Sequence, residues 1–168
     1  MDDEFVASVF ASLHHTAWRM TGDRSAADDL AQETLIVALK GWDSFDGRST
    51  RSTWVHGILI RLARKHFRTL TRLRRRIQRY VKESEKHESV NDHADQIAET
   101  EWQQSIWSEV AKLPRPQAET IVLRFGQQLT YDEIAQAVGC AVGTAKSRVH
   151  QGLQRLRQSA LEPDLFQE

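Results

Sequence analysis

The side chains best suited to chemistry lie in residues 130–150, where short polar groups and cations follow a glycine turn. Thr130 and Glu133 have the spacing of a helix capping box, and Gly139 is placed to turn the chain into a second helix. Such polar groups at the start of a helix can reach base edges and phosphates in the major groove of DNA. The segment predicts a DNA-binding helix-turn-helix, and an ordinary helical hairpin with a solvated basic face is the alternative. The candidate contact residues are Thr144, Lys146, Ser147, Arg148 and His150.

A second candidate site is the run from Arg61 to Arg79, which holds nine Lys or Arg and no Asp or Glu. Many of these cations recur every three or four residues, so on a helix they form a stripe along one face. Cations follow a nucleic-acid backbone, exposed rings stack on unpaired bases, and a polar loop can accept a base turned out of the duplex. This pattern is typical of a surface for single-stranded DNA. The alternative is a buried Trp54 beside a solvated basic face. The candidate residues are Phe45, Arg48, Ser49, Trp54, His56, Arg61 and Lys65.

The third candidate is an acidic segment at Asp28, Asp29 and Glu33. These carboxylates suit three roles: complementing a helix dipole, forming a polar surface for another protein, or holding a divalent metal in a nucleic-acid-processing enzyme. The sequence contains no phosphate-binding glycine loop, no His-Glu-x-x-His and no Gly-x-Ser-x-Gly. The single cysteine, Cys140, excludes an intramolecular disulfide and a zinc cluster built on cysteines. We therefore expect a protein that is not an enzyme and needs no metal or cofactor.

Helical periodicity dominates the elements that must position these residues, so we expect an all-helical protein. Between Glu83 and Glu101 the chain holds seven carboxylates and one cation, Lys86. This polar stretch is predicted to be a linker, because it cannot bury enough apolar surface to offset the entropy lost on folding. The expected domains are residues 1–80 and 101–161, joined by a linker at 81–100 and followed by a tail at 162–168. The expected helices cover about 4–20, 25–40, 53–79, 101–112, 116–125, 130–138 and 143–160.

The charges of the chain are balanced overall but segregated along it. The 168 residues include 23 Lys or Arg and 23 Asp or Glu, so the average alone would argue against a polyanionic partner. The separate basic and acidic blocks instead indicate separate partners for separate segments. The N-terminus lacks the pattern of a signal peptide, and no stretch approaches the roughly 20 apolar residues that span a bilayer. We expect a cytoplasmic protein without a membrane segment.

Several motifs follow one another in a definite order along the chain. They are Asp28–Glu33, Trp42–Phe45 with Trp54, Leu113–Pro114, Leu129–Ala135 and Val142–Arg148. Together they resemble the extracytoplasmic-function (ECF) sigma factors, which direct bacterial RNA polymerase to promoters. The resemblance covers about residues 4–79 and 101–158. It implies two small helical domains, sigma region 2 and sigma region 4, joined by a flexible acidic linker.

The resemblance also implies a role for each candidate site. It assigns docking on the clamp helices of the β′ subunit of core RNA polymerase to Asp29, Gln32 and Glu33. It assigns the melted strand of the −10 element to Phe45, Arg48, Ser49, Trp54, His56, Arg61 and Lys65. It assigns the −35 element to Thr144, Lys146, Ser147, Arg148 and His150, and it implies an anti-sigma factor as a further partner. A conventional regulator that binds duplex DNA through the helix-turn-helix, and the metal-dependent enzyme above, remain as alternatives.

Overall fold

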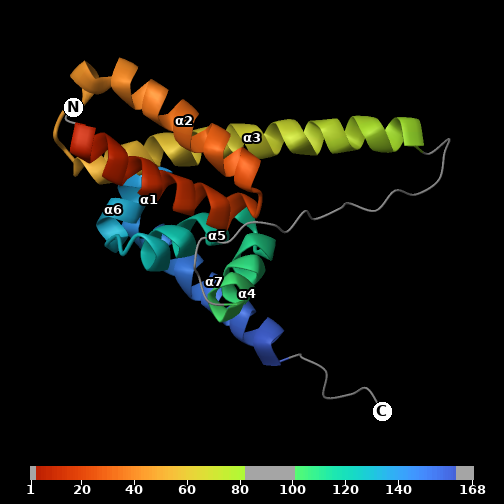
Figure 1. Cartoon of the computed structure of the whole chain (residues 1–168). Helices are drawn as coiled ribbons and strands as arrows, with labels where there is room; N and C mark the ends of the chain where they lie inside the picture. Colours follow the sequence, from red (N-terminus) through yellow and green to blue (C-terminus); the bar gives the residue numbers. More distant parts are fainter. Residues whose placement is uncertain (1–2, 82–100, 162–168) are drawn as a thin grey trace, which may run out of the picture.

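The computed structural model describes residues 3–81 and 101–161, and all the secondary structure in these ranges is helical (Figure 1). This confirms the all-helical prediction. The helix ends lie within two residues of those expected, except that α5 ends at Ile121, four residues before the expected end, and continues as a π turn. Elements not anticipated from the sequence are a 3-10 turn, η1, and a π turn, η2, that ends the fifth helix. In chain order the elements are α1 (Asp3–Thr21), α2 (Arg24–Lys40), η1 (Trp42–Ser44), α3 (Arg51–Val81), α4 (Glu101–Lys112), α5 (Arg115–Ile121), η2 (Val122–Gly126), α6 (Tyr131–Val138) and α7 (Val142–Leu161).

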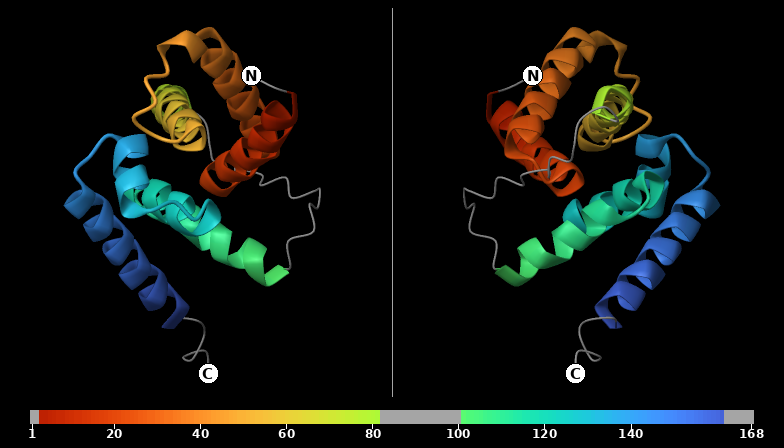
Figure 2. Two further views of the ribbon diagram at one scale, coloured as in Figure 1. Left: turned by 90° about the vertical axis from the view of Figure 1, so that its left-hand side faces the viewer. Right: turned by 90° about the vertical axis from the view of Figure 1, so that its right-hand side faces the viewer.

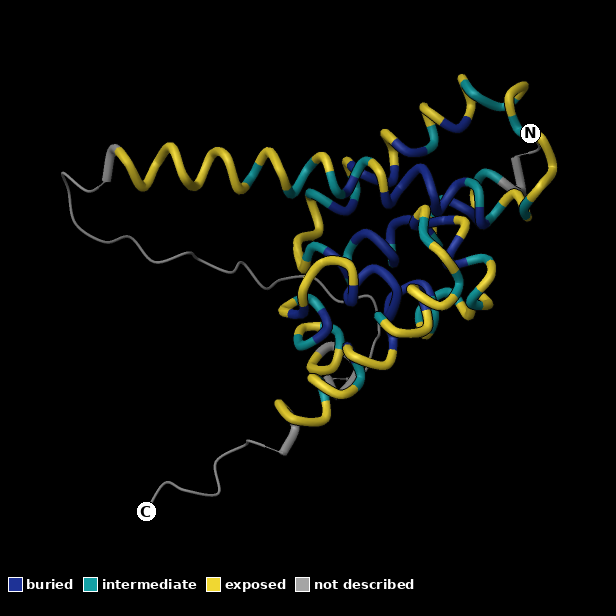
Figure 3. Tube along the Cα trace, turned by 180° about the vertical axis from the view of Figure 1, so that it is seen from behind, coloured by how far each residue is buried: buried dark blue, intermediate teal, exposed yellow. Residues whose placement is uncertain are grey.

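The N-terminal half is a bundle of α1, α2 and the first part of α3. The chain reverses between α1 and α2 at Gly22, whose φ of 67° lies in the left-handed region that favours glycine. Asp23 then caps α2, accepting a hydrogen bond of 2.7 Å from the amide of Ala26. The far part of α3 extends beyond the rest of the described chain and is exposed along its length (Figures 1 and 3). Within the described ranges, no helix has the length and apolar character needed to cross a membrane.

The C-terminal half consists of α4 to α7, with α5 packed closely on α7. Gly152 of α7 is buried, and a Cβ added there would lie 2.5 Å from Cδ1 of Ile121. The absence of a side chain at this position therefore allows α7 to approach α5 closely. Two prolines begin α5, where a missing backbone amide proton costs no helical hydrogen bond.

The two halves pack against each other, with α6 lying on the first part of α3 (Figures 1 and 2). Gly57 of α3 is buried in this contact, where an added Cβ would lie 3.3 Å from the backbone oxygen of Ala137 on α6. Buried apolar residues from both halves form one continuous core, including Leu13 and Leu59 from the first half and Leu123 and Ile134 from the second. The separate domains expected from the sequence thus share one packed interior in this structure.

Candidate nucleic-acid and protein interfaces

The helix-turn-helix is built as the sequence predicts. Thr130 and Glu133 form a reciprocal capping box at the start of α6: the Glu133 amide donates to Thr130 Oγ1, and the Thr130 amide donates to the Glu133 carboxylate. These hydrogen bonds, led by that of the Thr130 amide, hold the pKa of Glu133 below its usual value. Gly139 ends α6 in the left-handed conformation, with φ at 72°, and its amide donates to the Ala135 carbonyl. The turn thereby fixes the direction in which α7 leaves.

The start of α7 presents most of its predicted DNA-contacting residues to solvent. Thr144, Lys146, Ser147 and His150 are exposed, and Arg148 is half-buried. On the opposite side of the helix, Ala145 and Val149 are fully covered by the core. The ammonium of Lys146 also lies 5.7 Å from the ring centroid of Tyr131 on α6, within range of a cation–π interaction. The polar residues predicted from the sequence thus share the outer face of α7.

Three aromatic side chains cluster where α2 ends and α3 begins. The ring centroid of Trp54 lies 5.5 Å from that of Phe45 and 6.1 Å from that of Trp42. Arg51 covers the outer side of Trp42, with its guanidinium carbon 5.2 Å from the ring centroid. Trp54 is half-buried and packs against the core. The cluster therefore anchors the loop between the two helices, and its three rings are half-buried beside it.

The loop between η1 and α3 is tightly turned and leads into α3, which carries the basic stripe further along. Gly47 has a φ of 72°, and the Asp46 carboxylate accepts hydrogen bonds from the amide and from Nε of Arg48, at 3.1 and 3.0 Å. The side chain of Arg48 stays exposed, and Ser49 is half-exposed. Arg61 and Lys65, further along on α3, are also exposed. These loop and helix residues lie on the exposed surface of the N-terminal half.

His56 differs from the other residues of the predicted −10 set because the structure buries it completely. Its Nδ1 donates a hydrogen bond of 2.8 Å to the Ser52 carbonyl, and its Nε2 lies 3.3 Å from Ser12 Oγ on α1. Burial lowers the pKa of His56, and the hydrogen bond to Ser52 opposes this effect. In this arrangement the imidazole joins α3 to α1 and does not face solvent.

The outer face of α2 exposes the predicted docking residues Asp29, Gln32 and Glu33. It also exposes Ile36 and Val37, which are 52% and 39% exposed and continue this face toward the end of the helix. Neither aliphatic residue was predicted as part of the docking surface. A mixed polar and apolar surface of this kind is typical of a protein interface. The signal in the sequence that could have found them is their position four residues after Gln32 and Glu33, which places them on the same side of the helix.

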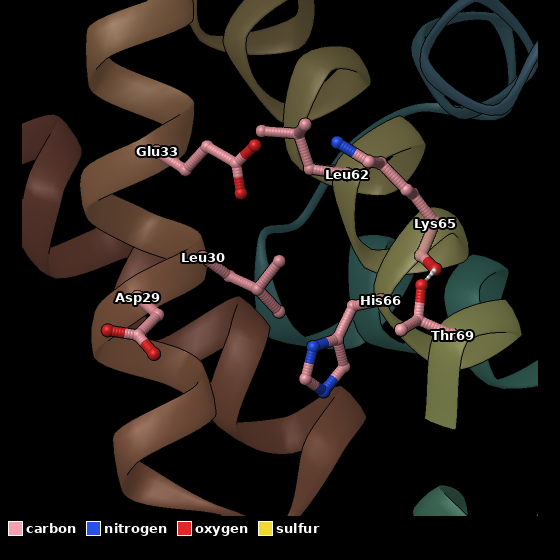
Figure 4. Close-up of a pocket in the computed structure, with 7 residues that line it drawn as sticks. All are labelled: Asp29, Leu30, Glu33, Leu62, Lys65, His66 and Thr69. Atoms are coloured by element: carbon pink, nitrogen blue, oxygen red, sulfur yellow. Dashed lines mark hydrogen bonds between the residues drawn. The ribbon is translucent and has the colours of Figure 1, made fainter. Parts of the chain in front are cut away.

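Asp29 and Glu33 also line a pocket between α2 and α3, opposite residues of the basic helix (Figure 4). Leu30 points across the pocket toward α3, while Lys65 and His66 approach it from the other side. Asp28 is directed elsewhere, since its Oδ1 lies 3.0 Å from Nε2 of His14 on α1. The structure therefore separates Asp28 from Asp29 and Glu33, although the sequence places the three carboxylates in one acidic segment.

The contact between the halves contains a charged pair that was not predicted from the sequence. The carboxylate of Glu119 on α5 accepts hydrogen bonds from Nε of Arg64, at 3.0 and 3.2 Å, and from its Nη2, at 2.6 Å. Nη1 of the same arginine donates to the Val138 carbonyl at the end of α6. The side chain of Glu119 is 2% exposed and that of Arg64 is 35% exposed. The hydrogen bonds to Glu119 raise the pKa of Arg64.

Further polar contacts join α1 to the C-terminal half. Gln127 bridges Ser12 and Thr16, with its Nε2 donating to Thr16 Oγ1 at 2.8 Å and its Oε1 accepting from Ser12 Oγ at 2.5 Å. Arg115 donates to the Met20 carbonyl and lies over the Phe67 ring, 3.3 Å from its centroid. Burial lowers the pKa of Arg115. The halves are thus held by apolar packing and by hydrogen bonds from α1 and α3 of the first half.

Comparisons with known proteins agree with this architecture. The Sigma-70 region 2 family matches residues 5–73, and the Sigma-70, region 4 family matches residues 103–156. The chain is 33% identical to the ECF RNA polymerase sigma factor EcfG of Rhodopseudomonas palustris, over 92% of this chain and 81% of that protein. It is 30% identical to the ECF RNA polymerase sigma factor SigW of Bacillus subtilis, over 87% of this chain and 81% of that protein.

Solved structures show the same fold. The sigma factor RpoE of Bartonella quintana, in complex with the anti-sigma factor NepR, superposes with a TM-score of 0.69 at 31% identity, over 96% of both chains. CnrH, in complex with the cytosolic domain of CnrY, superposes with a TM-score of 0.66 at 22% identity, over 96% of this chain and 87% of that one. The family matches, the identity to EcfG and the helix-turn-helix with its exposed polar face lead to one conclusion: this chain belongs to the ECF family of RNA polymerase sigma factors.

Proposed function

We propose that this sigma factor, which directs RNA polymerase to promoters, divides that task among three exposed surfaces. Residues 101–161 form the domain that recognises the −35 element, and residues 1–80 form the domain that binds core polymerase and the melted −10 element. The family matches to regions 2 and 4 support this division. Residues 81–100 are the tether between the two domains; Val81 ends α3, and residues 82–100 lie outside the described residues.

Recognition of the −35 element occurs through the outer face of α7. The observation that carries this proposal is the exposure of Thr144, Lys146, Ser147 and His150 on a helix oriented by the capping box and by Gly139. Arg148, half-buried beside them, supplies a fork of donors suited to the O6 and N7 acceptors of guanine. Exposed cations nearby hold phosphates and make binding sensitive to salt.

Capture of the melted −10 strand uses the loop between η1 and α3 and the turns of α3 that follow it. The exposed guanidinium of Arg48 and the hydroxyl of Ser49 supply donors to a displaced base or to the backbone. Trp54 and Phe45 supply ring edges beside them. Arg61 and Lys65 follow the phosphates along α3. The buried His56 is not part of this proposed set, because it has no access to DNA while the halves are packed.

Docking on the clamp helices of the β′ subunit uses the outer face of α2. Asp29, Gln32 and Glu33 supply charge and hydrogen bonds, and the adjoining Ile36 and Val37 supply apolar area that is otherwise left in water. The described surfaces are suited to binding, so the protein acts as an initiation factor and not as an enzyme. Its polymerase and promoter partners place it in the cytoplasm. The solved relative held by an anti-sigma factor supports such a partner here.

In vitro transcription tests the −35 assignment, with purified core polymerase and promoters randomised at that element. Arg148→Ala should lower initiation from preferred sites by about 5- to 150-fold, as loss of a base-edge contact worth about 1–3 kcal/mol predicts, and should relax selection at that position. Arg155→Ala is a matched control, since this exposed arginine lies two turns further along α7. Unchanged promoter selection by Arg148→Ala would contradict the assignment.

Co-purification with core polymerase tests the docking surface separately. Replacing Gln32 and Glu33 together by alanine should abolish the association and leave the helicity of the chain unchanged. Lys40→Ala, an exposed change at the end of the same helix, should leave the association intact. Full retention of the polymerase by the double variant would exclude these residues from the docking surface.

A further inference from the structure

The far end of α3 carries an apolar seam that continues the inward face of the helix. In the first part of α3, Leu59 and Ala63 of this seam are buried in the core. Beyond the bundle, Leu73 and Ile77 on the same face are 51% and 50% exposed. Spacings that alternate between three and four residues are those of a coiled-coil seam, which stays on one side of a helix over several turns. The α3 seam consists of Leu59, Ala63, His66, Leu70, Leu73 and Ile77.

Arginines border both sides of the exposed part of this seam. Arg74 lies three residues before Ile77, and Arg76 lies three residues after Leu73, so each flanks the apolar face on a different side. Both side chains are exposed. Since residues 61–79 contain no carboxylate, the helix itself supplies no counter-charge to them. The exposed end of α3 thus combines an apolar strip with positive margins, the pattern that a helix with acidic margins complements.

The charges and the side-chain types decide which kind of molecule can cover the exposed part of the α3 seam. A second copy of this chain would bring arginine margins against arginine margins, which repel. Nucleic acid favours the opposite face of α3, where Arg72, Arg75 and Arg79 project in line with Arg61. Aliphatic side chains such as Leu73 and Ile77 gain nothing from phosphates, whereas burial against apolar residues removes them from water.

We propose that the α3 seam from Leu70 to Ile77 is a docking site for an acidic amphipathic helix of a partner protein. The partner helix lies in line with α2 and extends the three-helix bundle by the two turns of α3 that the described part of the chain leaves uncovered (Figures 1 and 3). Its apolar residues interleave with Leu73 and Ile77, and its carboxylates pair with Arg74 and Arg76. This site is distinct from the promoter-contacting and polymerase-docking surfaces, so a partner can bind here without occluding either.

Peptide binding to the full-length chain tests this proposal, measured by fluorescence anisotropy. The probe is a synthetic helix of about three heptads with leucine at the seam positions and glutamate at the flanking ones. A second peptide carries lysine in place of glutamate, and a third contains the residues of the first in an order that destroys the seam. We expect the full-length chain to bind the first peptide at least about tenfold more tightly than either of the others.

Variants of the chain identify the binding surface. L73S/I77S should weaken binding of the acidic peptide about tenfold or more, and it should leave the affinity for a single-stranded oligonucleotide unchanged. R74E/R76E should transfer the preference to the lysine peptide. R72E/R75E is the matched control, because it makes the same change in net charge on the opposite face and should retain the preference for the acidic peptide. Glutamate is a good helix former, so these charge variants keep the test valid even if the serine variant frays the helix.

Three results would overturn the proposal. One is equal binding of the ordered and reordered acidic peptides, which would show attraction by charge alone. Another is an absence of peptide binding to the full-length chain, which would also be the outcome if another part of the chain already occupied the seam. The third is an equal loss of oligonucleotide and peptide affinity in L73S/I77S, which would make the seam part of a nucleic-acid surface.

Discussion

Removing Arg64 should destabilise the protein much more than neutralising its partner Glu119. In Arg64→Met, the Glu119 carboxylate loses the three hydrogen bonds that the guanidinium donates to it. Since the Glu119 side chain is only 2% exposed, water cannot replace them. Breaking a buried ion pair by removing one member costs about 3–5 kcal/mol. We expect a loss of that size in the free energy of unfolding.

Glu119→Gln should cost only about 1–2 kcal/mol, because the amide oxygen still accepts a hydrogen bond and the removed charge leaves no buried anion. The Arg64 side chain is 35% exposed, so water can solvate the guanidinium that remains. Replacing both residues, as Arg64→Met with Glu119→Leu, should recover most of the stability lost in Arg64→Met, because apolar side chains of similar volume often replace a buried ion pair at little cost.

Urea unfolding followed by circular dichroism at neutral pH measures all three variants. Arg64→Met and Glu119→Gln should differ in unfolding free energy by roughly 2 kcal/mol or more. If both variants lose the same small amount, below about 1 kcal/mol, then the pair is hydrated in solution and the halves are not packed as described. That result would refute the reasoning at its first step, the burial of Glu119.

Three further predictions concern the helix contacts and the turn. Gly57→Leu should push α6 away from α3, because a side chain there meets the backbone of Ala137, and a larger radius of gyration in X-ray scattering at unchanged helicity would confirm this. Burial holds the pKa of His56 below 6.5 in the folded state, so the unfolded chain binds more protons as the pH falls below that value. The free energy of unfolding should therefore fall by up to about 1.4 kcal/mol per pH unit because of this histidine. His56→Gln should lack this contribution, so urea unfolding at about pH 7.5 and 5.5 should show a smaller loss for this variant than for the unmodified chain. Equal losses in the two proteins would contradict the prediction. Gly139→Ala should lower the free energy of unfolding by about 1–2 kcal/mol, because alanine is strained at the positive φ of this position. Gly143→Ala, in the first turn of α7, should not have this effect. Equal melting temperatures for the two variants would count against a strained turn at Gly139.

Local signals in the sequence were sufficient to predict most of the fold. The capping box at Thr130 and the turn at Gly139 depend on residues a few positions apart, so spacing alone revealed them. Apolar periodicity located the helices for the same reason. The π turn η2 gave no such signal, since a run of apolar and helix-favouring residues is compatible with both α and π hydrogen bonding.

Contacts between the halves could not be predicted, because they join residues far apart in the chain. Arg64 belongs to a run of nine cations that the sequence presents as equivalent, yet the packing of α5 and α6 selects it for Glu119, 55 positions away. His56 is likewise buried by tertiary packing, although its neighbours in sequence suggested a surface position. Exposure of Ile36 and Val37 was missed because helical periodicity identifies apolar residues without showing which of them find a partner.

The charged pair between the halves limits how freely such proteins can be recombined. Sigma factors of this size look modular, and exchanging one half for the corresponding half of a paralogue is an obvious route to new promoter specificities. A chimaera that keeps Glu119 but receives an N-terminal half without an arginine at position 64 would inherit an anion with no counterion inside its core. Productive exchanges should therefore carry the two positions together, or lose them together.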